Sequence, residues 1–186
     1  MPRMSEAEKR KSHKRILDAA SHLFRERGIE ATSVSDIMLT AGLTHGGFYR
    51  HFSSKEALVA EAFKAAVKEV QSDMLAATDD QEREAARTQY MSRYLSQEHI
   101  DSMATGCPLA ALGTEITRMD GAARSEASQA VESMAQLLDD DPKGTTGITT
   151  LALLLGSITL ARLADTPELA ERILDAGKRG RQLLKQ

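Results

Sequence analysis

A glycine stands between two short apolar runs in residues 28–58, and this segment limits the fold more than any other part of the chain. The first run, residues 34–41, has helical spacing and is stopped by Gly42. Thr44 can cap the second run, in which Phe48 and Phe52 lie four residues apart and face inward. Two very short helices around a glycine turn, with a long capped helix behind them, predict a helix-turn-helix.

The inward-facing phenylalanines leave His45, Gly46, Tyr49 and Arg50 on the outer face of the second short helix. In a helix-turn-helix this face enters the major groove of DNA. Gly46 and its neighbour Gly47 each cost a helix about 1 kcal/mol relative to alanine. Close approach of the backbone to DNA explains the two glycines, and so does a loosely wound turn that tolerates them. The sequence leaves both explanations open.

Basic residues cluster in the stretch that precedes this segment. A capping box at Ser5–Glu8 and a stop at Gly28 predict a helix over residues 5–27. Its first turns carry five basic residues: Lys9, Arg10, Lys11, Lys14 and Arg15. A solvated face and a surface that lies along the DNA backbone both account for this cluster.

A long helix follows the helix-turn-helix. Ser53-Ser54-Lys55-Glu56 is a second capping box, and it opens a helix of about 23 residues that would span roughly 35 Å. The free backbone N–H groups of its first turn, together with Lys55, form a ready phosphate site. A helix of this length connects the N-terminal segment to a second domain. We therefore divide the chain into residues 1–58 and 59–186.

The rest of the sequence predicts helices only. Four prolines, no tryptophan and long runs rich in Ala, Leu, Glu and Arg indicate an all-α fold. Apolar spacing and breaks place the remaining helices at residues 85–99, 108–120, 122–138, 146–164 and 167–185. We expect a three-helix N-terminal domain joined by the long helix to an all-helical C-terminal domain.

The two expected domains differ in charge. Residues 1–58 hold 10 Lys and Arg against 7 Asp and Glu, whereas residues 59–186 hold 14 against 20. The net charge of -3 argues against a purely electrostatic nucleic-acid binder. A basic end on an acidic body is nevertheless expected if only that end meets phosphate.

The sequence favours a protein of a reducing compartment without a membrane segment. Cys107 is the one cysteine, which excludes an internal disulfide. Met1–Ser5 lead into charges without an apolar stretch, so we expect no signal peptide. Residues 144–161 are uncharged, but nine of them are Thr, Ser or Gly, which indicates a buried helix rather than a membrane span. We expect a cytoplasmic protein.

The spacing of residues in the first third of the chain matches a known family. The matching residues are Gly28, Thr32-Ser33-Val34, Ile37, Ala41-Gly42-Leu43-Thr44, Gly46, Phe48-Tyr49, His51-Phe52, Lys55-Glu56 and Leu58. This pattern resembles the DNA-binding domain of the TetR (tetracycline repressor) family over about residues 10–60. The resemblance implies a homodimeric, ligand-controlled bacterial transcription factor, usually a repressor, with a divergent all-helical C-terminal domain.

Position by position, the resemblance implies two kinds of DNA contact. The implied phosphate contacts are Ser33, Thr44, Tyr49, His51 and Lys55. The residues implied to lie nearest base edges are His45, Gly46 and Arg50. His51 has a second explanation, because a histidine beside Phe52 also packs or caps. With glycines at positions 46 and 47, part of any specificity would come from backbone approach and DNA shape.

The last two expected helices indicate a subunit interface. Residues 146–164 are apolar on most sides, and the final helix carries the small residues Ala176, Gly177 and Gly180 on its apolar stripe. The resemblance implies that these helices pair with their symmetry mates in a four-helix bundle. A twofold dimer would hold two recognition helices about 34 Å apart over a palindromic operator in double-stranded DNA.

One hypothesis for control of DNA binding is modification of Cys107. Pro108 suits the first position of a helix and Cys107 its N-cap. There the helix dipole stabilises a thiolate and raises reactivity toward oxidants or electrophiles. A Gly-Cys-Pro-Leu segment at this place resembles a subgroup of TetR-like regulators, some of which sense through such a cysteine. The alternative is a small buried hydrophobe.

A second hypothesis is a small apolar ligand bound within the C-terminal domain. Met and aromatic side chains at gaps between helices make adaptable pocket walls. The candidates are Tyr90, Met91, Tyr94, Met103, Leu112, Met134 and Leu138. At helical spacing such residues more often form plain core.

Other function classes have little support in the sequence. It contains no metal-ligand spacing, phosphate loop, paired carboxylates or recognisable catalytic triad, so we expect no metal, no cofactor and no enzymatic activity. A cysteine-dependent enzyme would need a basic partner, for which His99 and Arg118 are the candidates. A helical adaptor that binds proteins through its N-terminal domain is the third class.

Overall fold

The computed structural model describes residues 5–139 and 145–184, and within these ranges the chain forms helices and turns without a strand. The helices in chain order are α1 (Glu6–Arg27), α2 (Val34–Thr40), the 3₁₀ helix η1 (His45–Arg50), α3 (Lys55–Ala76), α4 (Asp80–Tyr94), α5 (Gln97–Asp101), the 3₁₀ helix η2 (Met103–Thr105), α6 (Pro108–Ile116), α7 (Ala122–Leu138), α8 (Thr146–Arg162) and α9 (Pro167–Leu184). The expected all-α class is confirmed.

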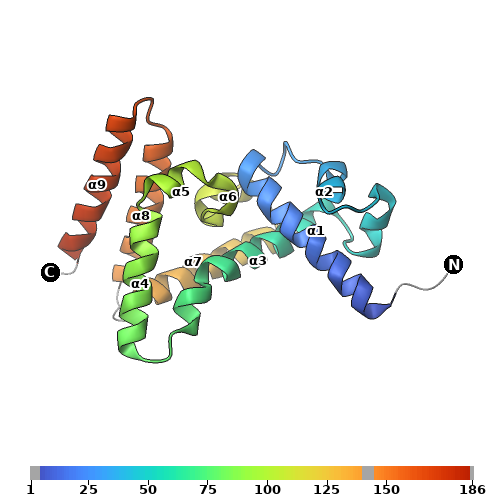
Figure 1. Ribbon diagram of the computed structural model, residues 1–186, viewed down its shortest axis with the longest axis horizontal. Coiled ribbons are helices and arrows are strands. Elements are labelled where there is room, and N and C mark those ends of the chain that lie inside the picture. The colour runs from blue at the N-terminus through green and yellow to red at the C-terminus, as the bar shows by residue number, and fades with distance from the viewer. Residues whose placement is uncertain (1–4, 140–144, 185–186) are drawn as a thin grey trace.

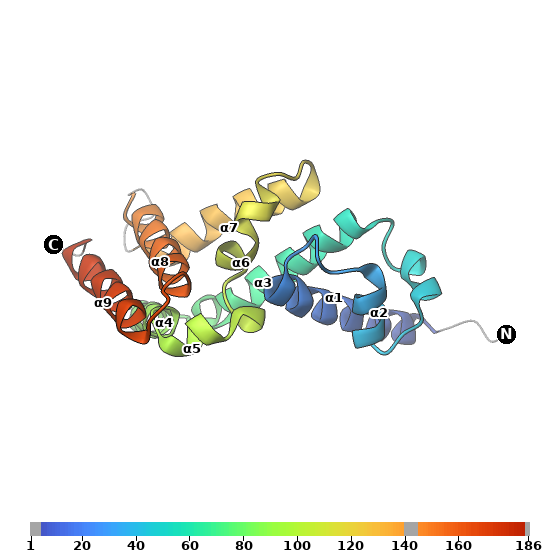
Figure 2. The ribbon, with the colours of Figure 1, turned by 90° about the horizontal axis from the view of Figure 1, so that it is seen from above.

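The molecule is elongated, with the N-terminal helices at one end and the C-terminal helix pair at the other (Figure 1). We call α1, α2, η1 and the first half of α3 the head, and α4 to α9 the body. In the view from above, α8 and α9 lie side by side at the end farthest from the N-terminus (Figure 2). α3 runs from the head into the body, as expected for the long connecting helix.

One hydrophobic core fills the head. Phe24, Phe48 and Phe63 are its largest buried side chains, from α1, η1 and α3. Leu112 and Ile116 of α6 belong to the same core, so α6 packs directly on the head. The boundary that we place after residue 58 falls inside α3 and stays a prediction.

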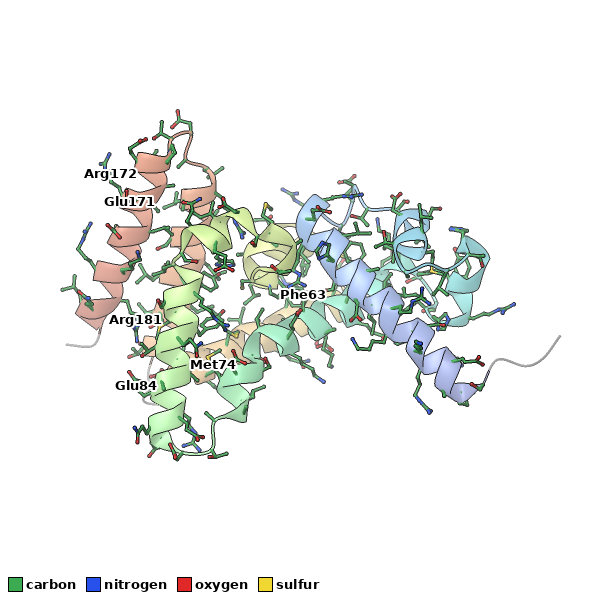
Figure 3. All side chains as sticks on the ribbon, in the orientation of Figure 1. Phe63, Met74, Glu84, Glu171, Arg172 and Arg181 are labelled. Atoms are coloured by element: carbon green, nitrogen blue, oxygen red, sulfur yellow. The ribbon has the colours of Figure 1, made fainter. Side chains whose placement is uncertain are left out.

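A second core fills the body. It joins Met74 at the far end of α3 to Tyr94 of α4, Met134 of α7 and Leu154 of α8. Phe63 and Met74 mark the two cores along α3 in Figure 3. α3 therefore belongs to both cores, and a tilt of this helix would move the head relative to the body.

Two predicted details of the helix starts are wrong. η1 is a 3₁₀ helix rather than an α-helix, and Thr44 makes no side-chain cap, although its carbonyl accepts the N–H of Gly47 (3.0 Å). Two adjacent glycines weaken an α-helical turn, and the short segment takes the more tightly wound 3₁₀ form instead. At α3 the N-cap is Ser54, not Ser53. The Phe52 N–H still donates to the Phe48 carbonyl of η1 (3.1 Å). Ser53 is therefore needed for the turn between η1 and α3, and Ser54 becomes the N-cap.

Two predicted helix ends are also wrong. The helix expected over residues 85–99 begins earlier and ends at Tyr94, because Leu95 leaves the helical conformation and Ser96 caps the separate helix α5. The helix expected over residues 108–120 ends at Ile116. The expected Cys107 N-cap position and Pro108 at the first helical position are confirmed, although the Cys107 side chain makes no cap hydrogen bond.

The small residues of α9 have a partner within the chain. A Cβ at Gly177 would collide with Ser157 of α8, and one at Gly180 would touch Leu153. These glycines therefore allow α8 and α9 of one chain to approach closely.

Several expectations concern residues outside the described ranges. They are Met1–Met4, which lead into the charged stretch, Gly144 at the start of the uncharged stretch, and Lys185 at the expected end of the last helix. In the described residues, no helix has the length and hydropathy needed to span a membrane.

Candidate functional site

The turn of the helix-turn-helix is built at Gly42. Its φ of +65° lies in the left-handed region, and a Cβ there would also collide with the guanidinium of Arg15 on α1. Backbone hydrogen bonds from Gly42 N–H to Leu39 (2.9 Å) and from Leu43 N–H to Met38 (2.8 Å) close the turn. The left-handed φ thus favours glycine at this position, and the turn sets the direction of η1 relative to α2.

η1 turns its outer face to solvent. Tyr49 is 73% exposed, and His45, Gly46 and Arg50 are exposed beside it. His45 is oriented by Ser35 of α2, whose hydroxyl lies 3.1 Å from its Nδ1. No atom of the described chain lies within 4 Å of where a Cβ of Gly46 would stand. The glycine therefore leaves backbone open to an approaching molecule.

The expected phosphate contacts Ser33, Thr44 and Lys55 all lie at or beside helix starts. The Ser33 hydroxyl donates to the Asp36 carboxylate (2.5 Å) and accepts the Asp36 N–H (3.1 Å). The hydroxyl and the backbone N–H of Ser33 both donate to the Asp36 carboxylate and hold the pKa of this carboxyl below its ordinary value. The Ser33 hydroxyl thus caps α2. A phosphate that contacts this hydroxyl would compete with the Asp36 carboxylate for it. Lys55 begins α3, whose N-cap Ser54 accepts the Ala57 N–H (3.1 Å).

His51 lies partly buried between α1 and η1. Its ring is 6.0 Å from the ring of His13, which stacks on Phe52 at 4.5 Å. Nothing in the described ranges hydrogen-bonds to its buried Nδ1. Burial lowers the pKa of His51, and the neighbouring charges of His13, Lys9 and Arg50 lower it further. Packing of the His51 ring does not prevent a contact with phosphate. Its basic neighbours Lys9, His13 and Arg50 would surround a phosphate bound beside it.

The segment that forms this surface matches a known protein family. Residues 16–62 match the family described as bacterial regulatory proteins, tetR family. The matched segment of the chain is TetR-like. The matched residues cover α1 from Ile16 onward, α2, η1 and the start of α3, which belong to the head.

Curated relatives match only part of the chain. The HTH-type transcriptional repressor KstR2 of Rhodococcus jostii is 49% identical over 49 residues, which are 26% of this chain and 24% of that protein. The HTH-type transcriptional regulator AcrR of Shigella flexneri is 36% identical over 64 residues, covering 34% of this chain and 30% of that protein. The chain thus matches only a quarter to a third of the length of these relatives.

Likeness to solved structures extends over the body as well. SCO7518 from Streptomyces coelicolor is 27% identical, with a TM-score of 0.64, and the match covers 91% of this chain and 97% of that one. The body therefore has the fold of a solved protein, and its arrangement relative to the TetR-like head is shared.

A cavity of about 350 Å³ lies in the body between α3, α4 and the segment that leads to α6. Two of the residues expected to line a ligand pocket do line it, Tyr90 and Tyr94, and so does Cys107. Met103, Leu112 and Met134 do not: Met103 is on the surface, and the other two are buried in the cores. Sequence spacing could not separate core from cavity, because both kinds of residue recur with helical period.

The two tyrosine hydroxyls in this cavity wall are unusual. Tyr90 and Tyr94 are 7% and 3% exposed, and neither hydroxyl has a hydrogen-bond partner in the part of the chain that the structure describes. Burial raises the pKa of both well above 10, and the Cys107 thiol raises it further. Both groups therefore stay protonated donors near neutral pH. A buried donor without an acceptor typically costs about 1–3 kcal/mol.

Cys107 is buried, 3% exposed, and its main chain is fixed by His99. The Cys107 N–H donates to Nε2 of His99 (3.1 Å), and Nδ1 of His99 donates to the Tyr94 carbonyl (2.8 Å). Burial lowers the pKa of His99, with a further lowering by Arg162 and an opposing effect of the Tyr94 hydrogen bond. Both ring nitrogens are occupied, so His99 positions the Cys107 backbone and is not free to act as a base.

The segment before α6 is joined to the head by Arg25. This α1 residue is 4% exposed, and its guanidinium donates to the Gly106 carbonyl (3.0 Å) and to Ser21 of its own helix (3.1 Å). Burial lowers the pKa of Arg25, and Glu69 opposes this through its charge. We did not expect this contact. Its sequence signal is the pair Ser21 and Arg25, two polar residues four apart beside the apolar stripe of α1.

The other end of α6 also contacts the head. The Glu115 carboxylate accepts the N–H groups of Ile29 (2.9 Å) and Glu30 (3.3 Å) in the turn between α1 and α2. Gly28 has a φ of +88°, and a Cβ there would stand 3.0 Å from this carboxylate. The segment before α6 and the C-terminal turn of α6 thus both contact the head. In the described ranges we find no cluster of His, Cys, Asp and Glu that could hold a metal ion.

Proposed function

We propose that this chain is a transcription factor that binds double-stranded operator DNA through its head, and that it acts as a homodimeric repressor. The observation that carries the proposal is the solvent-facing surface of η1, where His45, Gly46, Tyr49 and Arg50 lie together on a helix-turn-helix. Ser33, Thr44, His51 and Lys55 flank this surface and would contact phosphate. Residues 1–58 would then bind DNA, and residues 59–186 would dimerise and regulate.

A dimer is supported by the apolar surface of the α8–α9 pair. Its exposed apolar side chains are Ile148, Leu160, Leu163, Leu169 and Leu183. Several exposed apolar side chains on one helix pair are typical of a subunit interface. Pairing of two copies would cover it and would present two heads to a palindromic operator with half-sites about 34 Å apart.

Control of DNA binding is proposed to act at the cavity in the body, by a small ligand or by modification of Cys107. The contacts from Arg25 to Gly106 and from Glu115 to the α1–α2 turn would carry a change at the cavity to the head. A small shift at a packed element is enough to bias two arrangements of such a molecule.

Footprinting on the DNA upstream of the chain's own gene tests the DNA-binding proposal. We expect protection of a palindrome by the intact chain and loss of protection for Arg50→Ala. Arg118→Ala, an exposed arginine of the body, serves as control and should protect the same bases. The proposal would be contradicted if neither the intact chain nor Arg118→Ala protected any DNA at concentrations at which both are folded.

Alkylation tests the control proposal. Complete alkylation of Cys107, verified by mass spectrometry, should weaken operator binding, and Cys107→Ser should bind equally before and after treatment. Unchanged affinity of the fully alkylated wild type would remove Cys107 from the regulatory mechanism.

A further inference from the structure

One side chain of α2 is hydrogen-bonded to the first residue of η1. The Ser35 hydroxyl lies 3.1 Å from Nδ1 of the His45 ring. The two helices lie side by side at the N-terminal end of the molecule (Figures 1 and 2). Among the described residues, this is the one hydrogen bond between a side chain of α2 and a side chain of η1. Ser35 therefore connects α2 to a residue that we expect near base edges.

Little else orients the His45 ring. The residue is exposed, and the two residues that follow it are glycines, which offer no side chain for the ring to pack against. No described atom lies within 4 Å of where a Cβ of Gly46 would stand. An exposed side chain without packing partners samples several rotamers. The hydrogen bond to Ser35 is therefore the contact that selects one orientation of the ring.

We propose that Ser35 is a positioning residue for base recognition. Its hydroxyl donates to Nδ1 of His45, keeps the ring proton on Nε2, and so presents an N–H donor to a base edge in the major groove. The inference rests on the proposed function, because it requires that η1 enters the major groove. It gives α2 a part in the choice of operator sequence.

The hydrogen bond at Nδ1 sets the chemistry of the other ring nitrogen. A neutral histidine carries one ring proton, and a nitrogen that accepts a hydrogen bond leaves this proton on the other nitrogen. The Ser35 hydroxyl has no other acceptor among the described residues, so its proton is available to Nδ1. Nε2 stands at the tip of the side chain and bonds to no other described residue. The tip of His45 is thus a free donor.

A donor at this position discriminates between bases. In the major groove guanine presents two acceptors, N7 and O6, whereas cytosine presents the N4 amino group, which is a donor. An Nε2–H group therefore favours guanine and is repelled by cytosine. The other tautomer, with an unprotonated Nε2, would instead accept a hydrogen bond from cytosine. A ring that exchanges between the two tautomers would discriminate poorly, so base preference depends on Ser35 even if Ser35 does not reach the base.

The surface around this pair is open to a duplex. Ser35 and His45 are both exposed. Leu39 follows Ser35 by one turn of α2 and is 78% exposed, and Tyr49 of η1 is 73% exposed. DNA that approaches η1 can therefore reach the tip of His45 without displacing the Ser35 hydroxyl from Nδ1.

The first test measures the tautomer of His45 without DNA. The intact chain, labelled with ¹⁵N in its histidines, is studied by NMR at about pH 8, where an ordinary histidine is neutral. His45→Ala identifies the signals of His45 among the five histidines. The chemical shifts of the two ring nitrogens should lie far apart in wild type and in Ser35→Thr, which keeps the hydroxyl. In Ser35→Ala, exchange between tautomers should bring them closer together.

The second test measures base preference. Each protein selects from a library of double-stranded DNA of random sequence, and the bound DNA is sequenced. The position at which His45→Ala loses its preference is the one that His45 reads. Ser35→Ala should fold, because the position is exposed and alanine favours a helix.

At the position read by His45, we expect wild type and Ser35→Thr to prefer guanine over cytosine by at least about fivefold, which corresponds to one hydrogen bond. Ser35→Ala should prefer guanine by less than about twofold, since its ring is no longer held in one tautomer. The preferences at the other positions should not change. Thr40→Ala, which removes another exposed hydroxyl of α2, is the matched control and should select the same sequences as wild type.

Four results would overturn the inference while DNA binding stands. They are equal ring shifts in wild type and Ser35→Ala, an unchanged base preference in Ser35→Ala, the same loss of preference in Ser35→Thr, and no position at which His45→Ala loses its preference. A library from which wild type selects no sequence would instead contradict the proposed function, and the inference with it.

Discussion

Single buried polar residues connect distant parts of this chain. Arg25 and Gly106 are 81 positions apart, yet a guanidinium of the head meets a carbonyl of the body. His99 joins the end of α4 to Cys107 through its two ring nitrogens. Each of these side chains holds a backbone position beside the cavity, so the chemistry of the cavity depends on a few hydrogen bonds.

The pH dependence of folding should report on His99. Its pKa in the folded chain lies below the ordinary value of 6.5, chiefly through burial. The unfolded chain therefore binds more protons as pH falls below 6.5, and stability falls until the pH is below the folded-state pKa. Protonation of Nε2 would also place two donors, this nitrogen and the Cys107 N–H, against each other.

We expect the thermal unfolding midpoint of wild type to fall between about pH 7.5 and about pH 5.5, and to fall less for His99→Gln. Calorimetry at several pH values measures this. His51 also lowers stability as the pH falls, because burial lowers its pKa too. His51→Gln is therefore measured beside His99→Gln to separate the two contributions. An equal pH dependence in wild type and His99→Gln would contradict the assignment.

The helices of the body differ in how closely they pack. At the start of α8, Gly147 lies against α7 so tightly that a Cβ would collide with the carbonyl oxygen of Ala135. Its N–H donates to the Asp139 carboxylate (2.9 Å). In α6, by contrast, no described atom lies within 4 Å of where a Cβ of Gly113 would stand.

Two glycine-to-alanine changes should therefore have opposite effects. Gly147→Ala forces α7 and α8 apart and should destabilise the fold by about 1–3 kcal/mol. Gly113→Ala removes flexibility from a helix without a collision and should be neutral or stabilising by up to about 1 kcal/mol. Urea unfolding measures both. Equal stability of the two variants would mean that α7 and α8 are not in close contact.

Local signals predicted the elements of this fold well, and contacts distant in sequence were missed. Capping residues and glycine stops act within a few positions, so the bounds of α1 and α2 could be predicted. The choice of Ser54 over Ser53 depends on how η1 ends, which no local pattern gives. The exposed residues of η1 followed from spacing, whereas the roles of Arg25 and His99 arise from tertiary contacts.

The whole molecule places a basic head at one end and an apolar helix pair at the other (Figure 2). If the pair is a dimer interface, the distance between two heads is set by the body. A change at the cavity could then alter DNA affinity without altering η1.

Substitution on α8 tests the dimer. Leu160 is 56% exposed, and Leu160→Glu should convert a dimer into a monomer of 20.3 kDa in sedimentation experiments. Leu75 of α3 is 61% exposed and lies outside the α8–α9 pair, so Leu75→Glu should remain a dimer. A wild type that sediments as a monomer at micromolar concentration would contradict the dimer proposal.

The salt dependence of operator binding is the most direct test of the whole account. For phosphate contacts, the logarithm of the affinity falls linearly with the logarithm of salt concentration, by about 0.9 for each phosphate neutralised. We predict a steep slope for wild type, a slope shallower by about one for each protomer in Lys55→Ala, and a wild-type slope for Arg118→Ala. Affinity that does not change with salt, or a Lys55→Ala slope equal to wild type, would contradict a head that binds the DNA backbone.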